Sequence, residues 1–95
     1  MVIKKAIAAG FDAAGITYKK EIKAPVIYQG KQISYYILDF LVEDKIVLEI
    51  KQGVKFKKQD FLQVEAYLEA NKLKLGILAI YTSSSVKYKR VLNLY

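Results

Sequence analysis

The sequence contains no cysteine and no histidine in its 95 residues. Without cysteine, the chain can form no disulfide and cannot use a thiol for catalysis or for metal binding. Without histidine, it has no imidazole general base, no Ser-His triad and no zinc site built on Cys or His. A metal ion in this protein would therefore have oxygen ligands, which Mg²⁺, Mn²⁺ and Ca²⁺ prefer.

Arginine and proline are scarce, since Arg90 and Pro25 are the only ones in the sequence. Lysine carries nearly all of the positive charge, and 16 Lys and Arg against 9 Asp and Glu give a net charge of +7. Such a basic balance is typical of proteins that bind nucleic acid or another anionic surface. Because lysine binds phosphate as a point charge, we expect contacts with a nucleic-acid backbone rather than bidentate reading of bases.

Length and apolar content predict one small domain over residues 1–95, with 54% hydrophobic residues to form its core. The apolar runs are interrupted by charged residues or glycine well before the ~20 residues that a membrane span needs. We therefore expect a protein without a membrane segment and with a cytoplasmic location.

Hydrophobic periodicity predicts two helices and five strands. In chain order they are a helix over 3–14, strands over 17–29, 33–42 and 45–51, a helix over 57–72, and strands over 74–82 and 86–94. The first three strands form an antiparallel meander, and Pro25 favours an edge position or a bulge for the first of them. The crossover from 45–51 to 74–82 implies a parallel pair, so the expected fold is α/β (α+β), a mixed sheet flanked by helices.

Charged residues interrupt the apolar strands at two places. Asp39 lies between Leu38 and Phe40, where an unpaired buried charge would be costly. Glu49 and Lys51 are two residues apart on the next strand and therefore point to the same face. In a hairpin that turns at Glu43-Asp44, Asp39 falls nearly opposite Glu49, so two carboxylates and one ammonium converge.

This group of charges has two interpretations. Asp39, Glu49 and the carbonyl of Ile50 form a ligand set for a hard divalent cation, and Lys51 can orient or deprotonate a water molecule beside it. The alternative is an ordinary cross-strand ion pair. Gln63 and Tyr67 favour the first interpretation, because they lie one turn apart on the following helix, with Gln63 on its inward face.

The order Asp39, Glu49-Ile50-Lys51, Gln63-xxx-Tyr67 resembles the PD-(D/E)XK nuclease superfamily, and most closely its small GxxExxY-type proteins. The likeness extends to the strand segments Tyr28–Gly30 and Leu75–Leu78 and to Lys89-Arg90-Val91. It implies a restriction-endonuclease-like αβββαβ(β) core and a metal-dependent nuclease that hydrolyses DNA phosphodiester bonds. It also implies that Asp39 and Glu49 bind Mg²⁺ or Mn²⁺, that Lys51 orients the attacking water, and that Gln63 and Tyr67 support the site.

One part of the family pattern is missing. In many members a glutamate on the first helix aids metal binding, and in the matching register it would precede Met1. Activity then depends on Asp39, Glu49 and Lys51 alone, or on another acid such as Asp12. The other expectation is a catalytically impaired module that keeps the fold for nucleic-acid binding or for oligomeric assembly.

Basic residues cluster on both sides of the proposed site in the sequence. The candidate contacts to DNA phosphates are Lys55, Lys57, Lys58, Lys87, Lys89 and Arg90. A solvated lysine-rich surface is the alternative interpretation of the same residues. Because cleaving two strands needs two sites, we also expect a homodimer or higher oligomer.

Overall fold

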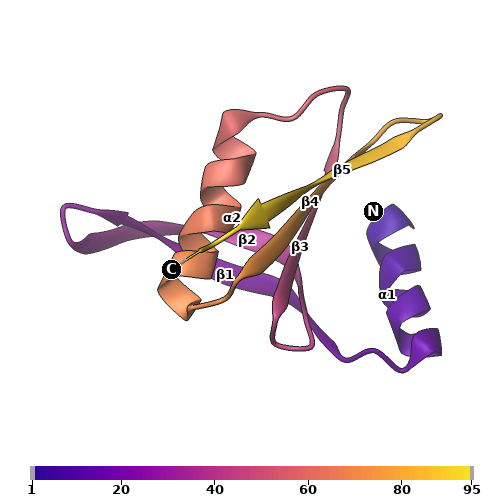
Figure 1. The fold of residues 1–95 in the computed structure, drawn as a ribbon, viewed down its shortest axis with the longest axis horizontal. Helices are drawn as coiled ribbons and strands as arrows, with labels where there is room; N and C mark the ends of the chain where they lie inside the picture. The colour runs from indigo at the N-terminus through magenta and orange to yellow at the C-terminus, as the bar shows by residue number, and fades with distance from the viewer. Residues whose placement is uncertain (1, 95) are drawn as a thin grey trace.

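The computed structural model describes residues 2–94, and its elements follow the expected order. They are α1 (Val2–Ala14), β1 (Tyr18–Tyr28), β2 (Lys31–Val42), β3 (Ile46–Gln52), α2 (Lys58–Asn71), β4 (Leu75–Tyr81) and β5 (Val86–Leu92). The strands form one sheet in the order β1-β2-β3-β4-β5 (Figure 1). The neighbours β3 and β4 are parallel and the other pairs are antiparallel, which confirms the mixed sheet and its helical crossover.

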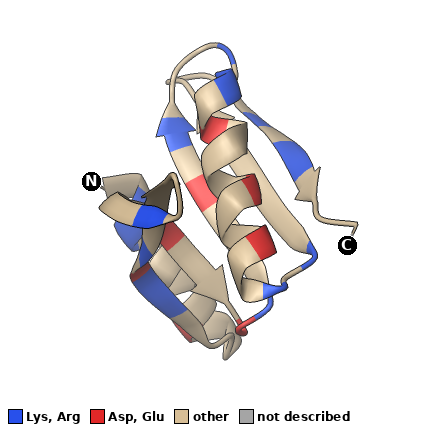
Figure 2. Ribbon diagram, turned by 90° about the vertical axis from the view of Figure 1, so that its left-hand side faces the viewer, with Lys and Arg blue, Asp and Glu red and all other residues tan. Residues whose placement is uncertain are grey.

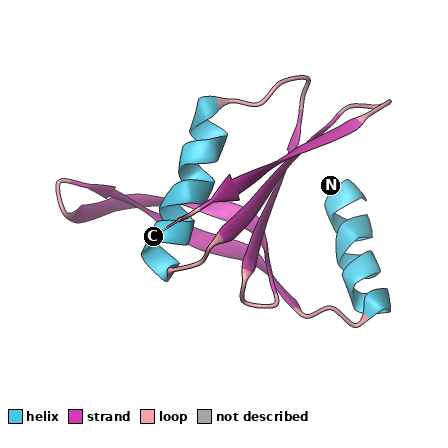
Figure 3. Cartoon of the chain, in the orientation of Figure 1, coloured by secondary structure: helices cyan, strands magenta, loops and turns pink. Residues whose placement is uncertain are grey.

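The two helices cover opposite faces of the sheet (Figure 3). Val64 and Leu68 of α2 pack in one buried cluster with Val47 of β3. Ala8 of α1 packs in a second cluster with Ile50. Since successive strand side chains alternate between faces, Glu49 and Lys51 share the α2 face with Val47, as the sequence predicts.

The ends of several elements differ from expectation by one or two residues. The second helix begins at Lys58 because Lys57 still has an extended backbone, and it ends at Asn71 because Lys72 adopts a left-handed conformation, with φ 55°. Pro25 lies in β1, which is an edge strand, as predicted. Neither helix of residues 2–94 is long and apolar enough to cross a membrane.

Strands β2 and β3 separate soon after the turn that joins them. Their paired residues are Phe40–Val42 on β2 and Ile46–Leu48 on β3, whereas β2 pairs with β1 along most of its length. Figure 1 shows the β1–β2 hairpin extending away from the rest of the sheet. Asp39 is therefore the first β2 residue beyond the β2–β3 ladder, at the point where the two strands part.

Three aromatic rings fasten α1 to the sheet. The ring centroid of Phe11 lies 5.3 Å from that of Tyr18 and 5.6 Å from that of Phe40. The Tyr18 and Phe40 centroids are 5.8 Å apart, in an edge-to-face arrangement. Aromatic pairs at this spacing add about 0.5–1.5 kcal/mol each to the burial of their surface. This cluster holds the side of α1 that carries Ala8 against β2.

Close packing of α2 on β4 depends on the absence of a side chain at Gly76. A Cβ atom there would lie 2.5 Å from Cγ1 of Val64, which is fully buried. Because a β-branched valine has little rotamer freedom in a helix, we expect Gly76→Ala to lower the free energy of unfolding by about 1–3 kcal/mol. Urea denaturation measures this change.

Gly10→Ala is the matched control, because Gly10 is an exposed residue inside α1 and a Cβ atom there meets no atom within 4 Å. Replacing an exposed helical glycine by alanine stabilises a protein by about 0.5–1 kcal/mol. The two substitutions therefore have opposite signs. A Gly76→Ala protein as stable as the wild type would contradict the close packing described for α2.

Candidate active site

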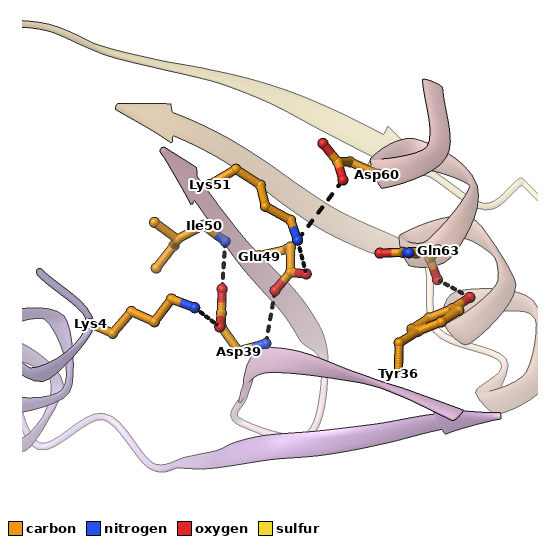
Figure 4. Close-up of polar contacts among 8 residues, drawn as sticks. All are labelled: Lys4, Tyr36, Asp39, Glu49, Ile50, Lys51, Asp60 and Gln63. Atoms are coloured by element: carbon orange, nitrogen blue, oxygen red, sulfur yellow. Dashed lines mark hydrogen bonds and ion pairs between the residues drawn. The ribbon is translucent and has the colours of Figure 1, made fainter. Parts of the chain in front are cut away.

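The carboxylates of Asp39 and Glu49 each accept a hydrogen bond from a backbone N–H of the other strand, at the point where β2 and β3 separate (Figure 4). The Asp39 N–H donates to Oε1 of Glu49 at 2.9 Å, and the Ile50 N–H donates to Oδ2 of Asp39 at 2.8 Å. These side-chain acceptors replace the cross-strand carbonyls that the parting strands no longer offer. The sequence prediction that Asp39 lies nearly opposite Glu49 is therefore confirmed.

A lysine pairs with each carboxylate. Nζ of Lys4, on α1, lies 2.5 Å from Oδ1 of Asp39, and Nζ of Lys51 lies 3.5 Å from Oε2 of Glu49. Nζ of Lys51 is also 3.9 Å from Oδ1 of Asp60, in the first turn of α2. Lys51 is thus held between a strand carboxylate and a helix carboxylate, and its side chain remains 41% exposed.

Glu49 is a nearly fully buried acid, with 2% of its surface exposed. Burial, and after it the hydrogen-bonded and negatively charged Asp39, raises the pKa of Glu49 to about 7, although the backbone N–H of Asp39 and the ammonium of Lys51 act in the opposite direction. A negative charge on Glu49 is therefore costly at this position, even with Lys51 beside it. A cation placed between the two carboxylates would reduce that cost.

Ile50 also fits a metal site at this position. The N–H and C=O of a strand residue point to the same neighbouring strand, so the Ile50 carbonyl faces the β2 side, as its N–H does. Within residues 2–94, no three His, Cys, Asp or Glu side chains are grouped to hold a metal. Asp39, Glu49 and this carbonyl are nevertheless the hard oxygen donors that Mg²⁺ and Mn²⁺ prefer, with water completing the shell.

Of the two predicted helix residues, the structure brings only Gln63 close to the carboxylates. Gln63 is half-buried, its backbone carbonyl accepts a hydrogen bond from the Tyr36 hydroxyl at 3.4 Å, and its amide is directed toward Lys51 and Glu49 (Figure 4). Tyr67 is buried among the apolar residues between α2 and the sheet. Burial raises the pKa of Tyr67, and its charged neighbours are Lys19 and Asp44 near the β2–β3 turn.

The predicted basic residues fall into two groups. Lys55 and Lys57 line a cavity of about 340 Å³ together with Lys51 and Asp60, in the loop that leads to α2, and Lys58 follows in its first turn. Lys51 and Lys87 both pair with Ile80 in the register, so they lie on one face. Figure 2 shows basic segments on α1, on the hairpin and from β3 into α2, around the acidic bands of β2 and β3.

The other two predicted residues of β5, Lys89 and Arg90, lie on opposite faces of the sheet. Lys89 lies on the same face as Lys87, with its Nζ 5.3 Å from the ring centroid of Phe56. Arg90 is opposite Ile77 and points to the other face by strand alternation. The structure therefore separates Arg90 from the other predicted phosphate contacts.

Lys4 and Asp60 are the polar neighbours of the site that sequence analysis did not single out. A signal for each exists in the helical spacing, since Asp60 is three residues before Gln63 and Lys4 is four residues before the buried Ala8. Asp12, considered above as a further acid, instead hydrogen-bonds Tyr18 and raises the pKa of that hydroxyl.

The raised pKa of Glu49 predicts that the metal-free protein loses stability as pH rises. Between the ordinary carboxyl pKa of 4.5 and a folded-state pKa of about 7, the folded chain binds more protons than the unfolded chain. The free energy of unfolding therefore falls across this window, by about 1–3 kcal/mol in total. Urea denaturation in EDTA at several pH values measures it.

Glu49→Gln is the control for this measurement, because it keeps the shape and removes the titrating group. We expect this variant to lose the fall in stability that Glu49 causes, while the contributions of all other groups remain in both proteins. The same dependence of the unfolding free energy on pH in the wild type and in Glu49→Gln would contradict the raised pKa of the buried Glu49.

A family model and two solved structures agree on the class of this fold. The sequence model of the PD-(D/E)XK nuclease superfamily matches residues 1–91, and no curated protein matches the chain. Among solved structures, the crystal structure of SSO0001 aligns with a TM-score of 0.68 and 18% sequence identity. The alignment covers 97% of this chain and 48% of the SSO0001 chain. The alkaline exonuclease LHK-Exo from Laribacter hongkongensis aligns with a TM-score of 0.61 and 18% sequence identity. This alignment covers 94% of this chain and 53% of the exonuclease chain.

The chain thus spans about half the length of these two proteins, which share its fold. The sequence motif predicts this superfamily, and the strands bring its residues Asp39 and Glu49 together. The match to the superfamily model covers both helices and nearly all of the sheet. The chain belongs to the PD-(D/E)XK nuclease superfamily.

Proposed function

We propose that this chain is a metal-dependent nuclease domain that hydrolyses phosphodiester bonds of DNA. The observation that carries the proposal is the reciprocal pairing of the Asp39 and Glu49 carboxylates, with the ammonium of Lys51 3.5 Å from Glu49. Membership of a nuclease superfamily and likeness to an alkaline exonuclease support a nucleic acid as the substrate.

Asp39, Glu49 and the Ile50 carbonyl would hold Mg²⁺ or Mn²⁺. When bound, such an ion would acidify a water molecule and neutralise negative charge that develops on the phosphate. The protein contributes two carboxylates that backbone N–H groups hold in place, one of them almost fully buried, so the carboxylates themselves need little reorganisation when the cation arrives. The burial of Glu49 beside Asp39, which raises its pKa to about 7, supports the same assignment.

Lys51 would orient the attacking water and stabilise the charge of the transition state. Its ammonium is anchored by Glu49 and Asp60 at 3.5 and 3.9 Å, and its side chain is partly exposed, so it can reach a phosphate at the C-terminal end of β3. Gln63, whose amide is directed toward the same point, would hold the water or the scissile phosphate. Tyr67 has a supporting role through packing of α2, because it is buried between this helix and the sheet.

Cleavage of plasmid DNA with Mg²⁺ or Mn²⁺ tests the proposal directly. Asp39→Ala removes a cation ligand and Lys51→Ala removes the cationic group nearest the reaction. We expect each substitution to lower the cleavage rate by at least about 100-fold, the usual cost of losing an electrostatic or acid–base partner of the transition state.

The β2–β3 turn provides matched controls for charge. Asp44→Ala and Lys45→Ala remove the same charges from the exposed turn, and both variants should cleave at the wild-type rate. Equal cleavage by the wild type, Asp39→Ala and Lys51→Ala would refute the assignment. A wild type that binds DNA and no Mn²⁺ would instead identify a nuclease-fold binding module.

DNA phosphates that contact the face of the sheet carrying Lys51 would be near Lys87 and not near Arg90, so the two residues of β5 should differ in their effect on DNA binding. Lys87 shares this face and is exposed, whereas Arg90 is exposed on the other face. We expect Lys87→Gln to weaken duplex binding and to reduce the slope of log K against log salt by about 1. Arg90→Gln should leave this slope unchanged, and fluorescence anisotropy over a salt series measures both. If Arg90→Gln reduced the slope of log K against log salt more than Lys87→Gln does, the DNA would lie on the opposite face of the sheet.

A further inference from the structure

Lys4 is the cation closest to the proposed metal ligands, and it comes from a helix that contributes no other group to the site. Its Nζ lies 2.5 Å from Oδ1 of Asp39, while Oδ2 accepts the Ile50 N–H. Oδ1 is therefore the oxygen of Asp39 that the backbone leaves open to a cation. The ammonium of Lys4 occupies that position in the protein as it stands (Figure 4).

A cavity of about 200 Å³ opens beside this ion pair, between α1 and β1. Its charged lining consists of Lys4, Lys5, Lys20, Glu21 and Asp39, and Phe40 is part of its apolar wall. Lys5 and Lys20 are exposed, and neither of them forms an ion pair within residues 2–94. With Asp39 occupied by a divalent cation, the three ammonium groups would face Glu21 alone, which leaves a net positive lining.

We propose that Lys4 is an exchangeable counter-ion of Asp39. It neutralises Asp39 in the metal-free protein, leaves Asp39 when a divalent cation binds there, and then contacts a backbone phosphate of the nucleic acid in the cavity that it lines with Lys5 and Lys20. This inference rests on the proposed function and adds to it a phosphate subsite on the α1 side of the catalytic centre.

The chemistry of lysine supports both halves of this exchange. An ammonium and a divalent cation repel each other, so both cannot share Oδ1 of Asp39. The side chain of Lys4 is 36% exposed and ends a flexible four-carbon stem, so it can move without unpacking α1. Once released, it is a point charge of the type that binds phosphate. By thermodynamic linkage, nucleic acid and divalent cation then strengthen each other's binding.

Calorimetric titration with Mn²⁺ tests the first half of the exchange. Lys4→Gln removes the competing charge, so we expect it to bind Mn²⁺ about three- to tenfold more tightly than the wild type. Lys4→Arg keeps the charge and should bind Mn²⁺ as the wild type does. Lys5→Gln removes a charge from the same cavity but not from Asp39, and its Mn²⁺ affinity should stay within about twofold of the wild type.

Anisotropy with a labelled DNA duplex tests the second half. In EDTA, Lys4 remains on Asp39, so Lys4→Gln and the wild type should bind the duplex equally. In Ca²⁺, which serves as the divalent probe, Lys4→Gln should bind several-fold more weakly, with a salt slope smaller by about 1. Lys5→Gln should be weaker in both conditions, because its ammonium is free throughout.

The outcomes separate this inference from the proposed function. Equal or weaker Mn²⁺ binding by Lys4→Gln overturns the exchange, even where the wild type cleaves DNA. A Lys4→Gln protein that loses DNA affinity equally in EDTA and in Ca²⁺ overturns it as well. No Mn²⁺ binding by the wild type or by Lys4→Gln, together with no cleavage, overturns the proposed function itself. A normal thermal melt of Lys4→Gln and wild-type behaviour of Lys4→Arg establish that the change is one of charge.

Discussion

The crossed hydrogen bonds of Asp39 and Glu49 are the interaction on which the rest of this structure depends. Strands β2 and β3 part at this point, and each loses a partner for its backbone N–H groups. Glu49 accepts the N–H of Asp39, and Asp39 accepts the N–H of Ile50. Each of the two acids therefore accepts a backbone N–H with one carboxylate oxygen and has its other oxygen beside a lysine of the candidate catalytic site. Alanine at either position leaves a backbone donor without its partner as well as removing a ligand.

Two helices on opposite faces each add a charged group to this pair. α2 brings Asp60 toward Lys51, and α1 brings Lys4 to Asp39. Each carboxylate of the pair thus has its own lysine, and the lysines approach from different elements. This arrangement explains how a buried glutamate is tolerated in a domain of 95 residues, and why both lysines remain partly exposed where a substrate phosphate would approach.

Much of this arrangement could be predicted from the sequence, because strand alternation and the short turn at Glu43-Asp44 fix which residues face each other. Asp39 and Glu49 were identifiable because they interrupt apolar runs. Tyr67 was expected at the site from its helical spacing to Gln63. The helix runs along the sheet, however, so one turn carries Tyr67 toward Lys19 and Asp44 and away from the carboxylates. The position of Lys4 depends on how α1 docks, which local patterns do not encode.

The separation in sequence of the groups at this site has a consequence for the order of folding. Asp39 and Glu49 are 10 residues apart in one hairpin, so closing that loop costs little entropy and their contact can form early. Lys4 reaches Asp39 only after α1 docks through Phe11 onto Tyr18 and Phe40. Until α1 docks, Lys51 alone opposes the repulsion between the two carboxylates, since it lies on the same strand as Glu49. The docking of α1 then adds the second ammonium, so the order of this helix and the charge of the site depend on each other.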